Sequence, residues 1–151
     1  MISASGQGVR RRSREMALQL LFQSEFAGSR AGSVSTKEIL QRFIDDFRVE
    51  RDVAEYGSTL FLGVSSRLNE IDVIIQDHSS HWRVSRMGLV DLSVMRVAVF
   101  EMRFLDPALT PHIVIDEAIE IARTFGSTES SSFVNGILDH IARKSNGTES
   151  R

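Results

Sequence analysis

A dense group of basic side chains near the start of the chain is the clearest chemical signal in the sequence. Its members are Arg10, Arg11, Arg12 and Arg14. Guanidinium groups bind phosphate oxygens through paired hydrogen bonds, and a cluster of them releases several counterions from a polyanion at once. The residue types and their spacing therefore predict an anchor for the phosphates of a nucleic acid.

The local position of this cluster is unusual. The arginines fall at the entry or first turn of an amphipathic helix predicted from about Val9. The positive end of the helix dipole disfavours each cation there by roughly 0.3–1 kcal/mol, and a bound polyanion would explain why they are tolerated. The alternative is a basic arm without a binding role, in which Arg11 and Glu15 form an i,i+4 pair in the weaker orientation. The net charge of −2 does not exclude binding, because a local basic patch can act within a mildly acidic chain.

Metal and cofactor chemistry receive little support from the sequence. His78 and His81 have i,i+3 spacing and Asp77 lies beside them, but no further ligand is indicated, so a solvated loop is the favoured interpretation. The chain has no cysteine, which excludes disulfides and thiolate metal sites. Glycine-rich phosphate-binding loops and nucleophile elbows are missing as well. We therefore expect no metal and no cofactor.

Two groups of polar residues could suggest catalysis, and each has a simpler interpretation. Asp116, Glu117 and Glu120 fall early in a predicted helix, where acidic residues suit the helix dipole and a solvated face. The serines at 130–132 have no adjacent base, and serine is an ordinary cap at the start of a helix. The sequence therefore favours a protein that is not an enzyme.

The elements that position these residues are predicted to be helices throughout. Apolar side chains recur at helical rather than alternating intervals. The predicted helical segments and stripes cover 9 to about 28, 35–47, 50–76, 92–102, 115–125 and 133–141. We expect an all-α fold of about six or seven helices, without an internal repeat or a clear domain boundary.

Several residues indicate where these helices begin, end or meet. Ser35 and Glu38 have the spacing of a capping box, and Thr110 with Pro111 is typical of an N-cap followed by a first helical proline. The segment 78–88 is predicted to be irregular or a short helix. Further expectations are that Ser85 caps that segment, that Gly57 and Gly63 allow close helix approach, and that 28–35 forms a loop.

Composition sets the class of protein. The chain has 151 residues, of which 42% are hydrophobic and 25% charged, which suits one ordinary globular domain with its own core. We expect a disordered N-terminal arm over 1–8, a helical domain over 9–144 and a disordered tail over 145–151. The start of the chain lacks the apolar core of a secretory signal, and no apolar run is long enough to span a membrane. A cytoplasmic location follows as an expectation.

Four sequence segments, in this order, resemble the NusB family of bacterial transcription antitermination factors. They are RRRSREMALQLLFQ (10–23), VDLSVMRVAVFEM (90–102), IDEAIEIARTFG (115–126) and FVNGILD (133–139). The resemblance runs from about Arg10 to Arg143 and implies an all-helical fold of two packed bundles. It also implies a non-enzymatic role: binding the single-stranded boxA element of nascent ribosomal RNA transcripts, together with the ribosomal protein NusE. Association with the transcription elongation complex and its RNA polymerase is implied too.

The resemblance also implies roles for single residues. The basic segment that touches RNA in the family matches the four arginines named above. Phe133, in the FVNG motif, is implied to stack on RNA or line its groove, with core packing as an equal alternative. Ser132 stands where the family often has lysine, which removes one phosphate contact, and the nearby Glu129 is no substitute. Asp91 matches an acidic position that contacts NusE, and Phe22 stands where some relatives have tyrosine at the partner surface.

Two alternatives from other classes stay open at this point. The same helical domain resembles the N-terminal part of certain RNA cytosine methyltransferases, although no strand and glycine-rich loop for a methyl donor follows in these 151 residues. A helical protein–protein adaptor with incidental arginines is the other. The sequence also leaves open whether the free protein is a monomer or a homodimer.

Overall fold

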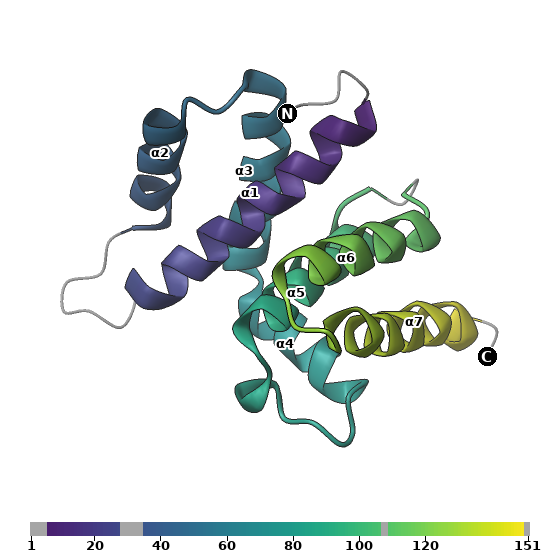
Figure 1. The fold of residues 1–151 in the computed structure, drawn as a ribbon. Helices are drawn as coiled ribbons and strands as arrows, with labels where there is room; N and C mark the ends of the chain where they lie inside the picture. Colours follow the sequence, from purple (N-terminus) through teal and green to yellow (C-terminus); the bar gives the residue numbers. More distant parts are fainter. Residues whose placement is uncertain (1–5, 28–34, 107–108, 150–151) are drawn as a thin grey trace. The chain divides into compact units, whose positions relative to one another are not determined.

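The computed structural model describes residues 6–27, 35–106 and 109–149. This described part of the chain contains seven α-helices and one short 3-10 helix, and no strand (Figure 1). The all-α prediction is confirmed. The chain divides into two compact helical units, Met1–Ser66 and Arg67–Arg151, which we call the N-terminal unit and the C-terminal unit. No membrane-spanning candidate occurs among the described helices, because none is long and apolar enough.

The N-terminal unit is built on the packing of α1 against α3. Its helices are α1 (Gly6–Ala27), α2 (Thr36–Phe47) and α3 (Arg51–Ser66). Ser13, which is fully buried in α1, donates from Oγ to the carbonyl oxygens of Val9 at 2.8 Å and of Val53 in α3 at 3.2 Å. A Cβ added to Gly57 would lie 2.5 Å from Met16 Sδ, so the absence of a side chain there allows the two helices to approach closely, as predicted.

The start of α2 follows the predicted capping chemistry. Ser35 is its N-cap, and Ser35 Oγ accepts a hydrogen bond from the backbone N–H of Glu38 at 3.1 Å and donates to the Glu38 carboxylate at 3.2 Å. At the other end Arg48 adopts the left-handed conformation with φ 48°, and its N–H closes onto the carbonyl oxygen of Ile44. Leu40 and Phe43 form the buried side of the helix.

The C-terminal unit surrounds one buried helix. Its helices are α4 (Leu68–Asp77), the 3-10 helix η1 (Val84–Arg86), α5 (Leu89–Phe104), α6 (Pro111–Phe125) and α7 (Ser130–Glu149). Every residue of α5 from 92 to 101 is buried, and α5 packs on α4, α6 and α7. Arg96 of α5 forms a two-pronged ion pair with Asp72 of α4, with both N–O distances at 2.8 Å. Thr110 and Pro111 begin α6 as predicted.

The predicted helix over 50–76 is wrong in one respect, because it is interrupted. It divides at Arg67 into α3 and α4, and this residue is also where the two units meet in sequence. The Ser66 hydroxyl donates to the carbonyl oxygen of Gly63 at 3.0 Å, and Arg67 leaves the helical region with φ −121° and ψ 23°. Serine side chains that bond to nearby carbonyls offer the backbone an alternative to the helical ladder, and this favours an interruption.

The predicted cap in the segment 78–88 is also wrong. The segment is irregular with one short helix, as expected, but Ser85 lies inside η1 and Arg83 precedes it. The structure closes this segment differently: the side chain of Gln76 donates to the carbonyl oxygen of Trp82 and accepts from the backbone N–H of Val84, both at 2.9 Å. The Gln76 side chain, six to eight positions earlier in the chain, thus takes the place of the expected Ser85 cap.

Helical structure extends further at both ends than the sequence indicated. α1 begins at Gly6 and α7 continues to Glu149, so parts of the predicted arm 1–8 and tail 145–151 are helical. Adding one residue to an existing helix requires far less free energy than starting a helix, which explains the extensions. The remaining residues of the arm and tail, and 28–34 of the predicted loop, lie outside the described residues.

Candidate nucleic-acid interface

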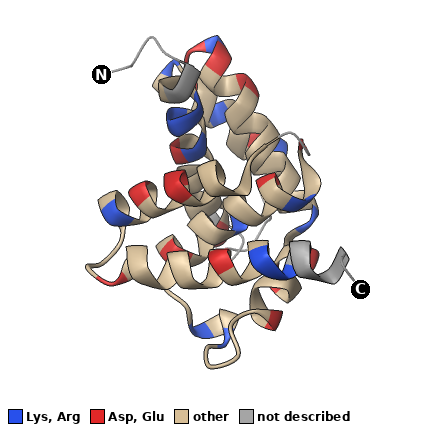
Figure 2. Ribbon diagram, turned by 90° about the vertical axis from the view of Figure 1, so that its right-hand side faces the viewer, with Lys and Arg blue, Asp and Glu red and all other residues tan. Residues whose placement is uncertain are grey.

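The four arginines of the basic cluster lie on α1, beyond its first turn. Because α1 begins at Gly6, Arg10 is already in the second turn, and the dipole effect falls off within the first. The expected electrostatic conflict is therefore largely absent, which corrects the sequence-based premise. Figure 2 shows basic residues gathered toward the N-terminal end of this helix.

The four side chains differ strongly in exposure. Arg10 is exposed, Arg11 and Arg12 are half-buried, and Arg14 is buried with 5% of its surface exposed. Arg11 and Arg14 both have interaction partners within the protein. Consecutive residues on a helix are separated by about 100°, so the four arginines spread over roughly 200° of the circumference of α1 and do not form one narrow face. Its accessible charge comes from the exposed Arg10 and the half-buried Arg11 and Arg12.

Arg12 makes only a weak ion pair. Its Nη1 lies 3.5 Å from Glu50 Oε1, and the two side chains are 34% and 52% exposed. Exposed pairs of this kind stabilise a protein by about 0–1 kcal/mol. A phosphate could therefore replace the Glu50 carboxylate as the partner of this guanidinium without a large cost in stability.

Arg10 stacks on the only tyrosine in the sequence. Its guanidinium carbon lies 3.7 Å from the centroid of the Tyr56 ring, so the α1 cation covers the face of an α3 aromatic ring. An open pocket of about 450 Å³ lies beside this pair. The residues that line it are Val9, Arg10, Asp52, Glu55, Tyr56 and Thr59. No sequence motif marks Tyr56, and its only signal in the sequence is that it is the single tyrosine of the chain.

Phe133 lies in the first turn of α7, and its surroundings are partly those of a packed core residue and partly those of a surface residue that RNA could reach. Its ring is half-buried and meets the Trp82 ring edge-on, with centroids 5.9 Å apart and planes at 88°. Trp82 is itself 59% exposed, and the neighbouring Arg83 and Arg86 are exposed. No motif in the sequence marks Trp82, although it is the single tryptophan of the chain and lies in a polar segment. Ser132 is exposed beside Phe133.

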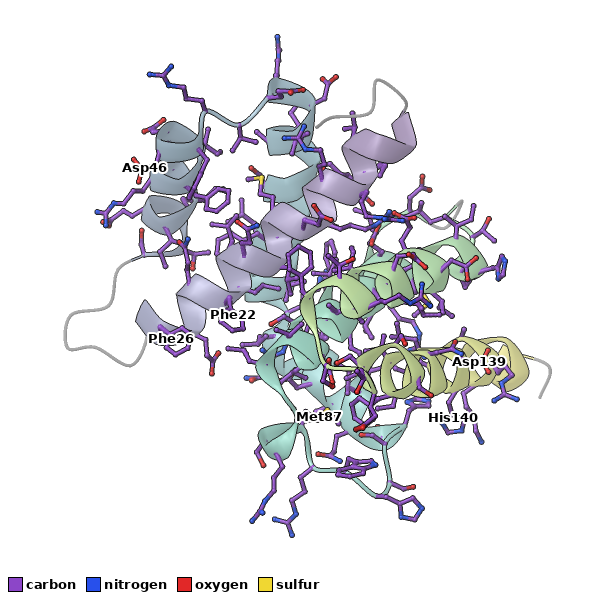
Figure 3. The ribbon with its side chains drawn as sticks, in the orientation of Figure 1. Phe22, Phe26, Asp46, Met87, Asp139 and His140 are labelled. Carbon is purple, nitrogen blue, oxygen red and sulfur yellow. The ribbon has the colours of Figure 1, made fainter. Side chains whose placement is uncertain are left out.

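The two candidate partner residues lie in different units. Phe22 of α1 is half-buried, and its ring lies 5.6 Å from that of Phe26, which is 59% exposed (Figure 3). Asp91 is half-buried in the first turn of α5. An acidic residue at that position also suits the helix dipole, so Asp91 has a local structural role in addition to the predicted contact.

The residues considered for metal binding do not gather around one point. Within the described ranges no group of three or more His, Asp or Glu side chains could hold a metal ion. His78 contacts His140 rather than His81, with ring centroids 5.0 Å apart, and its Nδ1 lies 2.8 Å from the carbonyl oxygen of Ile74. His81 is exposed.

The candidate carboxylates and serines have structural surroundings. Asp116 is exposed and pairs with His112, whereas Glu117 is 4% exposed, which corrects the expectation of a fully solvated face. Glu117 lies on the packed side of α6 and has an interaction partner. The Ser130 hydroxyl accepts from the backbone N–H of Ser127 at 2.8 Å, so it fixes the turn before α7 rather than capping an N–H of the helix.

Comparisons with known proteins agree with this architecture. The sequence model of the NusB family matches residues 11–143. The transcription antitermination protein NusB of Bdellovibrio bacteriovorus is 41% identical over 134 residues, which cover 89% of this chain and 95% of that protein. The corresponding protein of Desulfosudis oleivorans is 39% identical over 140 residues, which cover 93% of this chain and 89% of that protein.

Two solved structures have the same fold. The structure of T. maritima NusB superposes with a TM-score of 0.79 at 33% identity and covers 95% of this chain and 93% of that one. A crystal structure of the antitermination factors NusB and NusE in complex with dsRNA superposes with a TM-score of 0.78 and covers 90% of this chain and 97% of that one. At 23% identity, the second likeness shows the shared fold alone.

Proposed function

This chain belongs to the NusB family, and we propose that it is a transcription antitermination factor that binds single-stranded boxA RNA of nascent ribosomal transcripts. The proposal includes NusE as its partner and the RNA polymerase elongation complex, in the bacterial cytoplasm, as its place of action. Its support is the family match over 11–143 and two relatives near 40% identity that are named transcription antitermination proteins. Such a role is one of binding and needs no catalytic group.

The observation that carries the RNA-binding part is the accessible basic surface at the N-terminal end of α1. Arg10 is exposed, Arg12 is held only by a 3.5 Å contact to Glu50, and Arg11 is half-buried beside them. The helix that bears them is fixed to α3 by the buried Ser13 hydroxyl. Phosphate-binding groups are thus mounted on a packed element, which reduces the conformational entropy that binding must remove. Arg14, being buried, has at most a supporting role.

A second RNA contact is proposed in the C-terminal unit, at Phe133 and Trp82. Single-stranded RNA is recognised largely by stacking of its bases on aromatic rings. The edge-on pair presents the largely exposed Trp82 ring next to two exposed arginines, Arg83 and Arg86. These cations supply phosphate contacts in place of the lysine that is absent at Ser132.

The NusE contact is proposed to involve Asp91 and Phe22. A half-buried carboxylate in the first turn of α5 can pair with a basic side chain of a partner, and the Phe22–Phe26 rings offer apolar surface. Opposite charges across an interface accelerate association and select the correct partner. NusE is then expected to raise RNA affinity by adding its own contacts beside those of this chain.

Filter binding with a boxA-like RNA and a scrambled RNA of the same composition, each with and without NusE, tests the proposal. We expect the boxA-like RNA to bind more tightly than the scrambled one, and NusE to increase this difference. Equal affinity for both RNAs, with NusE present, would refute boxA recognition. A lack of binding to either RNA would refute the RNA-binding role altogether.

A further inference from the structure

We propose that the pocket between α1 and α3 of the N-terminal unit binds a single RNA base through its hydrogen-bonding edge, with guanine preferred. This inference rests on the proposed RNA-binding function and adds a base-reading site to the phosphate contacts. The pocket residues on α3 are Asp52, Glu55, Tyr56 and Thr59, at i, i+3, i+4 and i+7, so they line one stripe of the helix. Arg10 of α1 covers the Tyr56 ring of this stripe.

Arg10 and Tyr56 provide a flat platform for a base. The guanidinium lies 3.7 Å above the centre of the tyrosine ring, so one face of its plane is occupied by that ring. Because Arg10 is exposed, the opposite face can be reached from solvent. Bases of single-stranded RNA stack on both aromatic rings and arginine planes. Contact with Tyr56 holds the arginine plane in place before RNA arrives, which lowers the cost of binding.

The charges in the pocket favour a base over a phosphate. Asp52 is exposed and lines the pocket. The Glu55 carboxylate has only a 3.5 Å contact with Arg51, and their side chains are 69% and 90% exposed. Inside the pocket the two carboxylates disfavour a phosphate group, whereas they accept hydrogen bonds from the N–H groups of a base. The pocket interior therefore favours a base edge over the backbone, while the exposed Arg10 stays available to a phosphate outside the pocket.

The carboxylates also indicate which base fits best. A carboxylate accepts two parallel hydrogen bonds from one planar partner. Guanine presents two neighbouring donors on its Watson–Crick edge, the N1–H and the N2 amine. Adenine and cytosine present one amine beside an acceptor, and uracil presents one N–H between two acceptors. The volume of about 450 Å³ is near the lower end for small-molecule sites, which suits one base and its sugar.

The test is equilibrium binding of uridine 12-mers that carry guanosine, inosine or uridine at one central position. The proteins are the full chain, the double variant Asp52→Asn/Glu55→Gln, and Asp46→Asn as a control. Asp46 is an exposed acidic residue of α2 in the same unit and lies outside the pocket (Figure 3). All three proteins are compared by circular dichroism and thermal melting, so that a loss of folding is not mistaken for a loss of binding.

The parent is expected to bind the guanosine RNA about tenfold more tightly than the all-uridine RNA, in line with the discrimination of a good two-bond base contact. Inosine, which lacks the N2 amine, should bind with intermediate affinity. The double variant should lose the guanosine preference to within about twofold while binding all-uridine RNA as well as the parent or better, because two negative charges are removed. Asp46→Asn should retain the preference.

Three results would overturn this inference and leave the proposed function standing. The parent could bind RNA without preferring guanosine, or the folded double variant could keep the preference. The control Asp46→Asn could also lose the preference as much as the double variant does. Tyr56→Leu gives an independent check, because removal of the ring platform should weaken guanosine RNA more than all-uridine RNA; equal weakening of both would also overturn it. A folded parent that binds none of the RNAs would refute the proposed function and this inference with it.

Discussion

The burial of Arg14 leads to a prediction that separates the basic cluster into two parts. Arg14 is 5% exposed and engaged within the protein, whereas its neighbours Arg10 and Arg12 reach solvent. Replacing Arg14 with alanine removes a buried side chain together with its interactions inside the protein. Loss of a buried polar interaction of this kind destabilises proteins by about 1–3 kcal/mol. In a chain of this length each kcal/mol lowers the melting temperature by about 2–4 °C, so we expect a fall of roughly 2–12 °C.

Thermal melting and urea denaturation, followed by circular dichroism, measure this effect. The matched control is Arg51→Ala, because Arg51 lies in the same unit, its side chain is 90% exposed, and its single ion pair is weak. We expect this control to change stability by no more than about 0.5 kcal/mol. Under conditions where Arg14→Ala is fully folded, the salt dependence of its RNA binding should equal that of the parent. If Arg14→Ala were as stable as Arg51→Ala and flattened the salt dependence, Arg14 would be a phosphate contact and the division would be incorrect.

Three further predictions concern packing and partner binding. Asp72→Ala leaves the guanidinium of Arg96 buried without its two-pronged partner and should lower the free energy of unfolding by about 2–4 kcal/mol in urea, while a loss below 1 kcal/mol would show that the pair contributes little. Gly57→Val places a branched side chain against Met16, 2.5 Å from the added Cβ, and should destabilise the N-terminal unit by about 1–3 kcal/mol; an unchanged melting curve would mean that the Met16 side chain can move aside at no cost. Asp91→Lys should weaken NusE association in a pull-down or calorimetric titration while leaving RNA binding by the isolated chain intact; a change in both, or in neither, would remove Asp91 from the partner surface.

The helices and some of their ends could be predicted because their causes are local. Ser35 and Glu38 are three residues apart and form the predicted cap, and Thr110 directly precedes Pro111 at the start of α6, although the Thr110 side chain makes no capping hydrogen bond. The apolar intervals likewise gave the all-α class. The interruption at Arg67 was not visible, because no proline marks it and Ser66 resembles many exposed helical serines.

The details of the candidate site depend on contacts between distant parts of the chain. The sequence shows four closely spaced arginines as equivalent, but packing buries Arg14 and places Arg10 on Tyr56, which is 46 positions further along. Trp82 meets Phe133 in the same way, across 51 positions. Residue type predicted the kind of chemistry, and tertiary packing decided which residues can perform it.

The salt dependence of RNA affinity tests the central proposal, that the N-terminal end of α1 anchors RNA phosphates, most directly. The full chain is compared with the triple variant Arg10→Ala/Arg11→Ala/Arg12→Ala, using the boxA-like and the scrambled RNA, with thermal melts to verify folding. If the three arginines neutralise two or three phosphates, the slope of log K against log salt should become less negative by about 1.4–2.1 in the variant, because each phosphate on a single strand contributes about −0.7. Affinity for both RNAs should fall by a similar factor, since phosphate contacts position the RNA without selecting its sequence. Parallel slopes with equal affinities would contradict the account and leave the arginines without a role in binding RNA.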